Sequence, residues 1–389
     1  MFGGGRIRAV ALLVALTALI APEARASDRA SFPLPRGYTI AGIDHLADGV
    51  THVRYVALSP RRNVNVAFIR PGAAARMKVV VSNDRIAGGT ETVRSMCARA
   101  GCIMGVNADL FSFGSGQPAG GMASQREFFK TPQSFRPHLM QAGDGSTSIG
   151  NLTTTIRFFA SYPERVEPFY IHGINVPRGS GQAVLYTPLW APTTQTGSGF
   201  EITLAPVDAE ATPRFGEPLR VRMVQGFGAG SSSLLPGTMV LSAHGPYATL
   251  LSNLWNDVLA GRATGDAELT FAAPPEADTF TGGWPQLLRG GHQSFTDRTW
   301  SFYSEQARTL AGRTADGTVM LAVIDGGRGS YWTGVRLLDA MRFMRSMGAV
   351  DALNMDGGGS STFVVRGRAV NHPLRGERGV ASALVLVPA

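Results

Sequence analysis

A polar, glycine-dense loop at residues 354–362 holds the most concentrated set of groups in this sequence that could carry out chemistry. It lies between two apolar runs and reads Asn-Met-Asp-Gly-Gly-Gly-Ser-Ser-Thr. Consecutive glycines lack Cβ atoms, so the backbone can adopt positive φ and bring its N–H groups close to a bound oxygen. The alternative is a flexible hairpin connection, for which glycine and serine are ordinary turn residues. If the loop binds a ligand, its candidate binding residues are Asn354, Gly357, Gly358, Gly359, Ser360, Ser361 and Thr362, and its candidate catalytic carboxylate is Asp356.

A second candidate catalytic carboxylate, Asp325, directly follows the apolar run 319–324, which has the length of a buried strand. The turn after it contains Arg328, a candidate binding residue. A helix is predicted next, over residues 333–348, and a second strand over 349–353 leads into the glycine loop. Strand, helix and strand predict a βαβ unit with neighbouring parallel strands, so both aspartates would lie at one sheet edge. Alternatively, each aspartate only stabilises its own turn.

A similar layout occurs nearer the N-terminus. A strand over 77–81 and a helix over 90–99 are followed by a strand that ends in Asn107-Ala108-Asp109. An Asn-x-Asp triplet therefore closes the second strand of both units, either by internal duplication or by chance. Asp109 is a third candidate catalytic carboxylate. Asn107 is a candidate binding residue, unless it only caps the end of its strand.

The region between the two units reads differently. Residues 140–285 contain short alternating or apolar runs separated by glycine, proline and asparagine, which predict an antiparallel, β-rich middle with one helix near 247–260. We therefore expect an α+β (mixed α/β) fold, in which βαβ-type units at both ends flank this middle in one large domain over residues 49–389. Residues 27–48 are interpreted as an extended lead-in.

The N-terminus predicts a secretory signal peptide over residues 1–26. Two arginines precede a short apolar run, and an Ala-x-Ala site precedes Ser27. The alternative is a retained membrane anchor, although the run is short for a bilayer-spanning helix. We expect a secreted, periplasmic or cell-envelope protein without stable membrane insertion. Cys97 and Cys102 are the only cysteines, and a disulfide between them is expected in such a compartment.

The charge balance bears on the class of partner. The sequence has 36 lysines and arginines against 28 acidic residues, and only Lys78 and Lys130 are lysines. This balance suits an anionic substrate or surface polymer, although a coding bias would also replace lysine with arginine. The basic residues are scattered, which argues against a nucleic-acid partner. The seven histidines lie far apart without metal-ligand spacing, so we expect no catalytic transition metal and no other cofactor.

Several motifs together resemble those of the phosphodiester glycosidase family, in the family's order. They are Gly105 to Phe111, Gln117 to Gly120, Leu241 to Gly245, Gly282 to Pro285, Ala307 to Thr309, Val323 to Gly327, the loop 354–362, and Glu377-Arg378 before Val380-Ala381. Many members have glycine and phenylalanine where Ala108 and Leu110 stand, and proline where Ala307 stands. The resemblance extends from about Gly49 to Pro388. It implies hydrolysis of a sugar from a sugar-1-phosphodiester, with release of the free sugar and a phosphomonoester.

This reaction suggests a role for each candidate. Cleavage of an anomeric C–O bond passes through an oxocarbenium-like state that is normally managed by two carboxyl groups. We assign Asp325 and Asp356 to the carbocation side, with Asp109 as the alternative second carboxylate. The amides of Gly357 to Gly359 and the hydroxyls of Ser360, Ser361 and Thr362 would bind the phosphate, with Arg308 and Arg378 supplying charge. Asn107 and Asp109 would hold sugar hydroxyls, unless Asp109 is the second carboxylate. Gly283, Arg328 and Asn354 are further candidate substrate-binding residues. Arg308 and Arg378 could instead be structural.

The leading hypothesis is an exported hydrolase that acts on a phosphodiester-linked glycan of a cell wall, capsule or exopolysaccharide. One alternative is a glycoside hydrolase of a phosphate-free surface polysaccharide. Another is a non-catalytic wall-glycan binding module, which the carboxylates and the glycine loop argue against. The sequence does not indicate an oligomeric state.

Overall fold

Antiparallel β-sheets dominate the computed structural model, which describes residues 31–208, 211–228, 230–327 and 331–389. The predicted signal peptide and Arg328 therefore lie outside the described residues. Two of the sheets face each other and are called the sandwich here. The eight-stranded sandwich sheet consists, in spatial order, of β1 Thr39–Ala47, β2 Val50–Leu58, β3 Arg61–Ile69, β22 Val319–Ile324, β21 Arg308–Thr314, β23 Ala349–Asn354, β19 Gln286–Arg289 and β20 His292–Gln293. Residues 39–47, which the sequence placed in a lead-in, form its edge strand β1.

The five-stranded sandwich sheet carries the other end of the chain. In spatial order its strands are β25 Arg368–Ala369, β24 Phe363–Val365, β5 Met104–Asn107, β26 Ser382–Pro388 and β4 Ala75–Val81. Alternate side chains of its strands and of the eight-stranded sheet fill a common core, for example Val79 of β4 and Leu321 of β22. Helix α4 Leu337–Ser346 packs on the outer face of the eight-stranded sheet, and α2 Val93–Ala100 packs on the outer face of the five-stranded sheet.

The predicted α+β fold with βαβ-type units is wrong. Strands β22 and β23 flank α4 in sequence, but β21 lies between them and pairs antiparallel with both. In the same way, β26 lies between β4 and β5, the strands that flank α2. Within the described residues, the only parallel pair of strands is β12 Gly173–Ile174 with β13 Ala183–Tyr186. The expected βαβ units are absent from the described residues because a distant strand separates the two strands of each one. The protein is instead mostly β, with its strands in four sheets.

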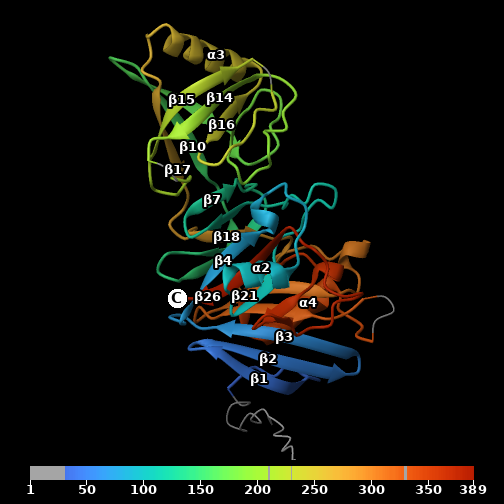
Figure 1. The fold of residues 1–389 in the computed structure, drawn as a ribbon. Helices are drawn as coiled ribbons and strands as arrows, with labels where there is room; N and C mark the ends of the chain where they lie inside the picture. The colour runs from blue at the N-terminus through green and yellow to red at the C-terminus, as the bar shows by residue number, and fades with distance from the viewer. Residues whose placement is uncertain (1–30, 209–210, 229, 328–330) are drawn as a thin grey trace, which may run out of the picture.

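The middle of the chain forms a nearly closed, barrel-like sheet (Figure 1). Its strands are, in spatial order, β11 Val166–Ile171, β10 Thr155–Ser161, β17 Asp266–Ala272, β15 Leu219–Phe227, β14 Phe200–Pro206, β16 Met239–Ala243, β13 and β12. The sheet curls on itself because β11 runs on into β12 through His172, whose backbone N–H donates to Ala183 of β13. Helix α3 Pro246–Leu259 packs against β14 and β16, close to the predicted range.

A small sheet lies between the barrel and the sandwich (Figure 1). Its strands, in spatial order, are β7 Glu127–Lys130, β6 Met122–Ser124, β18 Thr279–Gly282, β8 Pro137–Gln141 and β9 Thr147–Asn151. Its apolar side chains divide between the two neighbouring cores: Met122 and Leu139 join the sandwich core, whereas Phe128 and Phe280 join the barrel core. In the parts of the chain described, no helix has the length and apolar character needed to cross a membrane.

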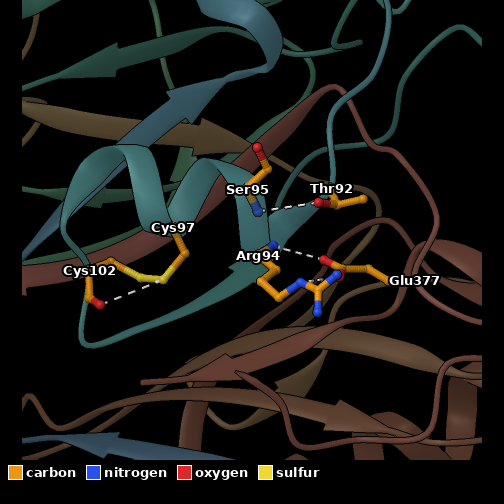
Figure 2. Close-up of a disulfide and its surroundings, with 6 residues drawn as sticks. All are labelled: Thr92, Arg94, Ser95, Cys97, Cys102 and Glu377. Atoms are coloured by element: carbon orange, nitrogen blue, oxygen red, sulfur yellow. Dashed lines mark hydrogen bonds and ion pairs between the residues drawn. A yellow bond between two sulfur atoms is a disulfide. The ribbon is translucent and has the colours of Figure 1, made fainter. Parts of the chain in front are cut away.

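Helix α2 is fixed at both ends (Figure 2). At its N-terminus the Thr92 hydroxyl accepts a hydrogen bond from the Ser95 backbone N–H at 3.2 Å. At its C-terminus Cys97 and Cys102 form a disulfide, with their Cα atoms 5.0 Å apart. The helix therefore provides a firm support for the segments that pack on it.

Candidate functional site

The glycine loop crosses from the eight-stranded to the five-stranded sandwich sheet, because it connects β23 to β24. Its backbone is held on both sides: the N–H of Asp356 donates to Ala108 beyond β5, and the N–H of Gly358 donates to Ala307 before β21, both at 2.9 Å. The side chain of Asp356 accepts the Gly357 N–H at 3.0 Å. The backbone N–H groups of Gly357 and Gly358 thus already donate hydrogen bonds within the protein. The loop then forms the 3₁₀ turn Gly358–Ser360.

The glycines of the loop lie in close contact with their neighbours. A Cβ on Gly357 would lie 3.0 Å from the Ala307 carbonyl oxygen, and one on Gly359 would lie 3.1 Å from Nη1 of Arg378. Gly358 has φ of 59°, a conformation that favours glycine. These glycines therefore allow the loop to approach β21 and Arg378.

Asn107 joins the elements that meet at the loop. Its side-chain nitrogen donates to the Asp356 carbonyl at 2.6 Å. Its side-chain oxygen accepts the Thr309 hydroxyl at 2.7 Å and the Thr362 N–H at 3.0 Å. Asn107 is fully buried, so these bonds give it the geometry of a positioning residue between β5, β21 and the loop.

Asp109 is buried next to the small sheet. One carboxylate oxygen accepts the Gly120 N–H, and the other lies 3.4 Å from the Arg136 guanidinium. A Cβ on Gly120 would lie 2.7 Å from Oδ2 of this carboxylate, and one on Gly282 would lie 2.8 Å from the same atom. The glycines of two separate sequence motifs therefore make room for the same side chain.

The two carboxyl groups of Asp109 and Asp356 influence each other. Burial raises the pKa of Asp356 to about 6, and the charge of Asp109 adds to this effect, whereas the Ser360 hydroxyl and Arg378 oppose it. Burial also raises the pKa of Asp109, and Arg136 is the main opposing charge. Two carboxyl groups with raised pKa values in electrostatic reach of each other are typical of acid–base sites.

Arg378 brings a positive charge to this pair. Its guanidinium donates to the Ser360 hydroxyl and lies over the Phe113 ring, 5.0 Å from the centroid. Its neighbour Glu377 is bound to the start of α2, where it accepts the Arg94 N–H at 2.8 Å (Figure 2). Helix α2 therefore holds the segment that directs Arg378 at the loop.

Several polar atoms around the loop are buried and lack a hydrogen-bond partner within the described part of the chain. They are Asn354 Oδ1, Asp356 Oδ2, Ser361 Oγ, Thr362 Oγ1 and Arg378 Nε. Buried polar atoms in proteins are normally paired, so a cluster of five unpaired ones indicates a place where a polar ligand can supply the missing partners.

Asp325 lies in a different hydrogen-bond network. Its carboxylate accepts bonds from the side-chain nitrogens of Asn63 and Asn371, at 2.6 and 2.9 Å, and from the His372 N–H at 3.0 Å. Asn371 also donates to the Ser361 carbonyl at 3.0 Å. Asp325 thus supports the glycine loop through Asn371, and its direct catalytic role stays a prediction.

Arg308 is completely buried, and burial lowers its pKa to about 10. Its Nη2 donates to the carbonyl oxygens of Phe302 and Ser304 at 2.7 and 2.8 Å, and its Nε donates to that of Val335 at 3.4 Å. The guanidinium is therefore engaged with backbone, which favours the structural alternative for this arginine.

Asn354 contacts the segment that contains Gly283 and Trp284. The Asn354 side-chain nitrogen donates to the Trp284 carbonyl at 2.7 Å. A Cβ on Gly283 would lie 2.6 Å from the Asn354 carbonyl oxygen, so only glycine fits there. The side-chain oxygen of Asn354 has no hydrogen-bond partner within the described residues, whereas Gly283 provides close packing.

Sequence reasoning missed several polar residues that complete the site. Arg136 and Lys130 surround Asp109, and Lys130 donates to the Gly120 carbonyl at 3.1 Å. Asn63 and Asn371 hold Asp325. One of these gave a signal, because Lys130 is one of only two lysines in the sequence.

Comparison with known proteins identifies sequences related to parts of the chain. A family model described as phosphodiester glycosidase matches residues 238–387. A stretch of 67 residues is 37% identical to the N-acetylglucosamine-1-phosphodiester alpha-N-acetylglucosaminidase of Mus musculus and covers 17% of this chain. The Bos taurus protein of the same name is 36% identical over 67 residues. The chain spans only 13% and 12% of the lengths of these two relatives.

Two crystal structures have a similar fold over most of the chain. A hypothetical protein from Synechocystis has a TM-score of 0.66 at 17% identity, and the match covers 91% of this chain and 68% of that protein. A protein from Burkholderia pseudomallei K96243 has a TM-score of 0.68 at 18% identity, and the match covers 92% of this chain and 98% of that protein. Likeness at this level of identity concerns the fold alone. The resemblance to the phosphodiester glycosidase family, which the motifs predicted, is confirmed by the family match over residues 238–387.

Proposed function

We propose that the protein is an exported hydrolase that cleaves a sugar from a sugar-1-phosphodiester in a cell-wall, capsule or exopolysaccharide glycan. One observation carries this proposal: Asp356 has a buried, unpaired carboxylate oxygen beside Arg378, with a second buried carboxyl group, Asp109, in electrostatic reach. The family match supports a hydrolase of phosphodiester-linked sugars in general.

The groups around Asp356 suit the two halves of such a substrate. The Arg378 guanidinium and the unpaired hydroxyls of Ser361 and Thr362 are donors for phosphate oxygens. Asp356, as a carboxylate, would stabilise or attack the carbocation side of the anomeric centre. A phosphate monoester leaves as a stable anion and needs little protonation. Asp109 would therefore mainly orient the sugar and modulate Asp356.

Export is part of the proposal. The N-terminal residues have the pattern of a signal peptide. The disulfide between Cys97 and Cys102 supports an oxidising compartment, because disulfides persist in secreted and periplasmic proteins and are rare in the cytosol.

The test compares a synthetic glycosyl phosphodiester with a phosphate-free glycoside of the same sugar. We expect the purified protein to release free sugar from the phosphodiester. Asp356→Asn should lower kcat/KM by at least about 10³-fold, and Asp109→Asn by about 10²-fold, without loss of folding. Asp208→Asn, which changes an exposed aspartate on the barrel, is the matched control.

Two outcomes would contradict the proposal. Near-wild-type turnover by folded Asp356→Asn would remove this residue from the reaction. Preferential cleavage of the phosphate-free glycoside would favour the alternative glycoside hydrolase.

A further inference from the structure

A groove with a volume of about 600 Å³ lies on the surface next to the candidate site. Aromatic side chains and arginines characterise it, and we name it the aromatic groove after Phe135, Trp284, Phe295, Tyr303, Arg289 and Arg298. Phe135 is 65% exposed and Trp284 is 40% exposed. Neighbouring exposed aromatic rings beside a cavity are typical of ligand-binding surfaces rather than of ordinary protein surface.

The aromatic groove is connected through the backbone to residues that contact Asp109 and Asn354. Phe135 is followed directly by Arg136, which contacts the Asp109 carboxylate at 3.4 Å. On the other side, Trp284 follows the glycines 282–283, the first of which borders Asp109. The backbone of Trp284 is also paired with Asn354, since its N–H donates to the Asn354 carbonyl at 2.7 Å. The backbone at both exposed aromatic residues is therefore tied to residues of the candidate site.

The groove is positively charged. Arg289 is held by Gln286, whose side-chain oxygen accepts at 2.8 Å, and Arg298 lies over the Trp300 ring at 5.0 Å. Neither arginine forms an ion pair with a carboxylate within the described residues, whereas the nearby Asp297 is paired with Arg336. The two guanidinium groups thus remain available to an anion.

We propose that the aromatic groove binds the neighbouring units of an anionic oligosaccharide, so that the enzyme acts on chains rather than on single sugar phosphodiesters. This inference rests on the proposed function. Flat aromatic faces pack against the C–H faces of sugar rings, and arginine binds the phosphate or carboxylate groups between the rings. Tyr303 and Phe295, with ring centroids 6.3 Å apart, form a stacked pair that also lines the groove.

The test measures the ratio of kcat/KM for an oligomer of glycosyl phosphate units to kcat/KM for a single unit carrying a methyl phosphodiester. We expect the wild-type ratio to exceed one by at least about tenfold, and to fall about tenfold in Phe135→Ala and in Arg298→Gln. Matched changes on the barrel surface, Tyr170→Ala and Arg220→Gln, should leave the ratio as it is. Thermal melting of each variant checks folding.

The outcomes separate this proposal from the proposed function. An oligomer-to-unit ratio that does not change in the groove variants overturns the groove assignment while hydrolysis stands. If the wild type hydrolyses neither substrate, the proposed function fails. In that case calorimetry measures binding of the oligomer to the groove. Phe135→Ala must weaken this binding if the groove assignment is correct. Preference for a glycosylated peptide with one phosphodiester unit over the oligosaccharide would assign the groove to peptide and overturn the proposal.

Discussion

Asp109 and Asp356 differ in how much of their hydrogen-bonding capacity the protein already uses. Both oxygens of Asp109 are contacted, by Gly120 and Arg136, whereas Asp356 keeps one buried oxygen without a partner. A carboxylate oxygen without a partner is available to a substrate. At the scale of single residues, this difference supports the proposal that Asp356 reacts with the substrate and that Asp109 sets its environment.

The pH dependence follows from the raised pKa of Asp356. Because a phosphate leaving group needs little protonation, Asp356 should act as a carboxylate, and kcat/KM should rise about tenfold per unit up to a pH of about 6 and then level off. Replacing Asp356 with asparagine should abolish this limb from the residual activity. Rates measured between pH 4 and 8 on the glycosyl phosphodiester provide the check. Activity that falls through pH 6 would instead assign Asp356 as a general acid.

The raised pKa of Asp356 should make the stability of the fold decrease with rising pH, whereas activity should increase. The folded pKa of Asp356, about 6, lies above its ordinary value of 3.8, so folding favours the protonated form. This contribution to stability is complete below the ordinary pKa and is lost as pH rises through about 6. The stability of Asp356→Asn compared with that of the wild type should therefore be greater at pH 8 than at pH 4. The melting temperatures of both proteins at these two pH values test the sign.

The elements show which parts of the fold and site could be predicted from sequence. Helices α2 and α4 and the strands beside them follow local periodicity, so they were predictable. The positions of β21 and β26 were not, because strand neighbours are chosen by long-range pairing that no local pattern encodes. The Asn-x-Asp triplets ending at Asp109 and Asp356 meet across two facing sheets, a contact that the sequence analysis did not predict.

Side-chain roles were less predictable than side-chain positions. Arg308 begins β21 in a family motif, which suggested phosphate binding, yet its guanidinium is turned to backbone carbonyls of residues 302, 304 and 335. Asp325 follows its strand as expected, but Asn63 and Asn371 approach it from distant segments. Such partners can be recognised only once the strands are placed, because sequence spacing carries no information about them.

The role of Arg308 can be tested as an anchor between elements. Arg308→Met keeps much of the volume but leaves the carbonyls of Phe302, Ser304 and Val335 without a donor, so we expect a loss of about 2–4 kcal/mol in the free energy of unfolding. Denaturant unfolding measures this loss. KM for the glycosyl phosphodiester should change less than about threefold in the folded variant. A large rise in KM with unchanged stability would show that Arg308 binds phosphate.

At the scale of the whole molecule, the segment that matches the family is not a structural unit. Residues 238–387 supply strands to all four sheets, and each sheet also needs strands from earlier in the chain. Strand β22 pairs with β3 along its whole length, and β26 pairs in the same way with β4. The site has the same character, since Asp109 precedes the matched segment and Asp356 lies within it.

We therefore expect residues 238–387 expressed alone to remain unfolded, although they contain Asp325, Asp356 and the glycine loop. Without β3, strand β22 would expose one edge, and without β4 and β5, strand β26 would expose both edges. Much of the sandwich core would also be exposed, and no local contact replaces that burial. The isolated segment should show poor amide dispersion by NMR and no cooperative melt, whereas residues 31–389 should melt cooperatively. Adding residues 31–237 as a separate chain should restore the melt if strand pairing is what is missing. A dispersed spectrum and cooperative unfolding of 238–387 alone would mean that the sandwich does not depend on its N-terminal strands.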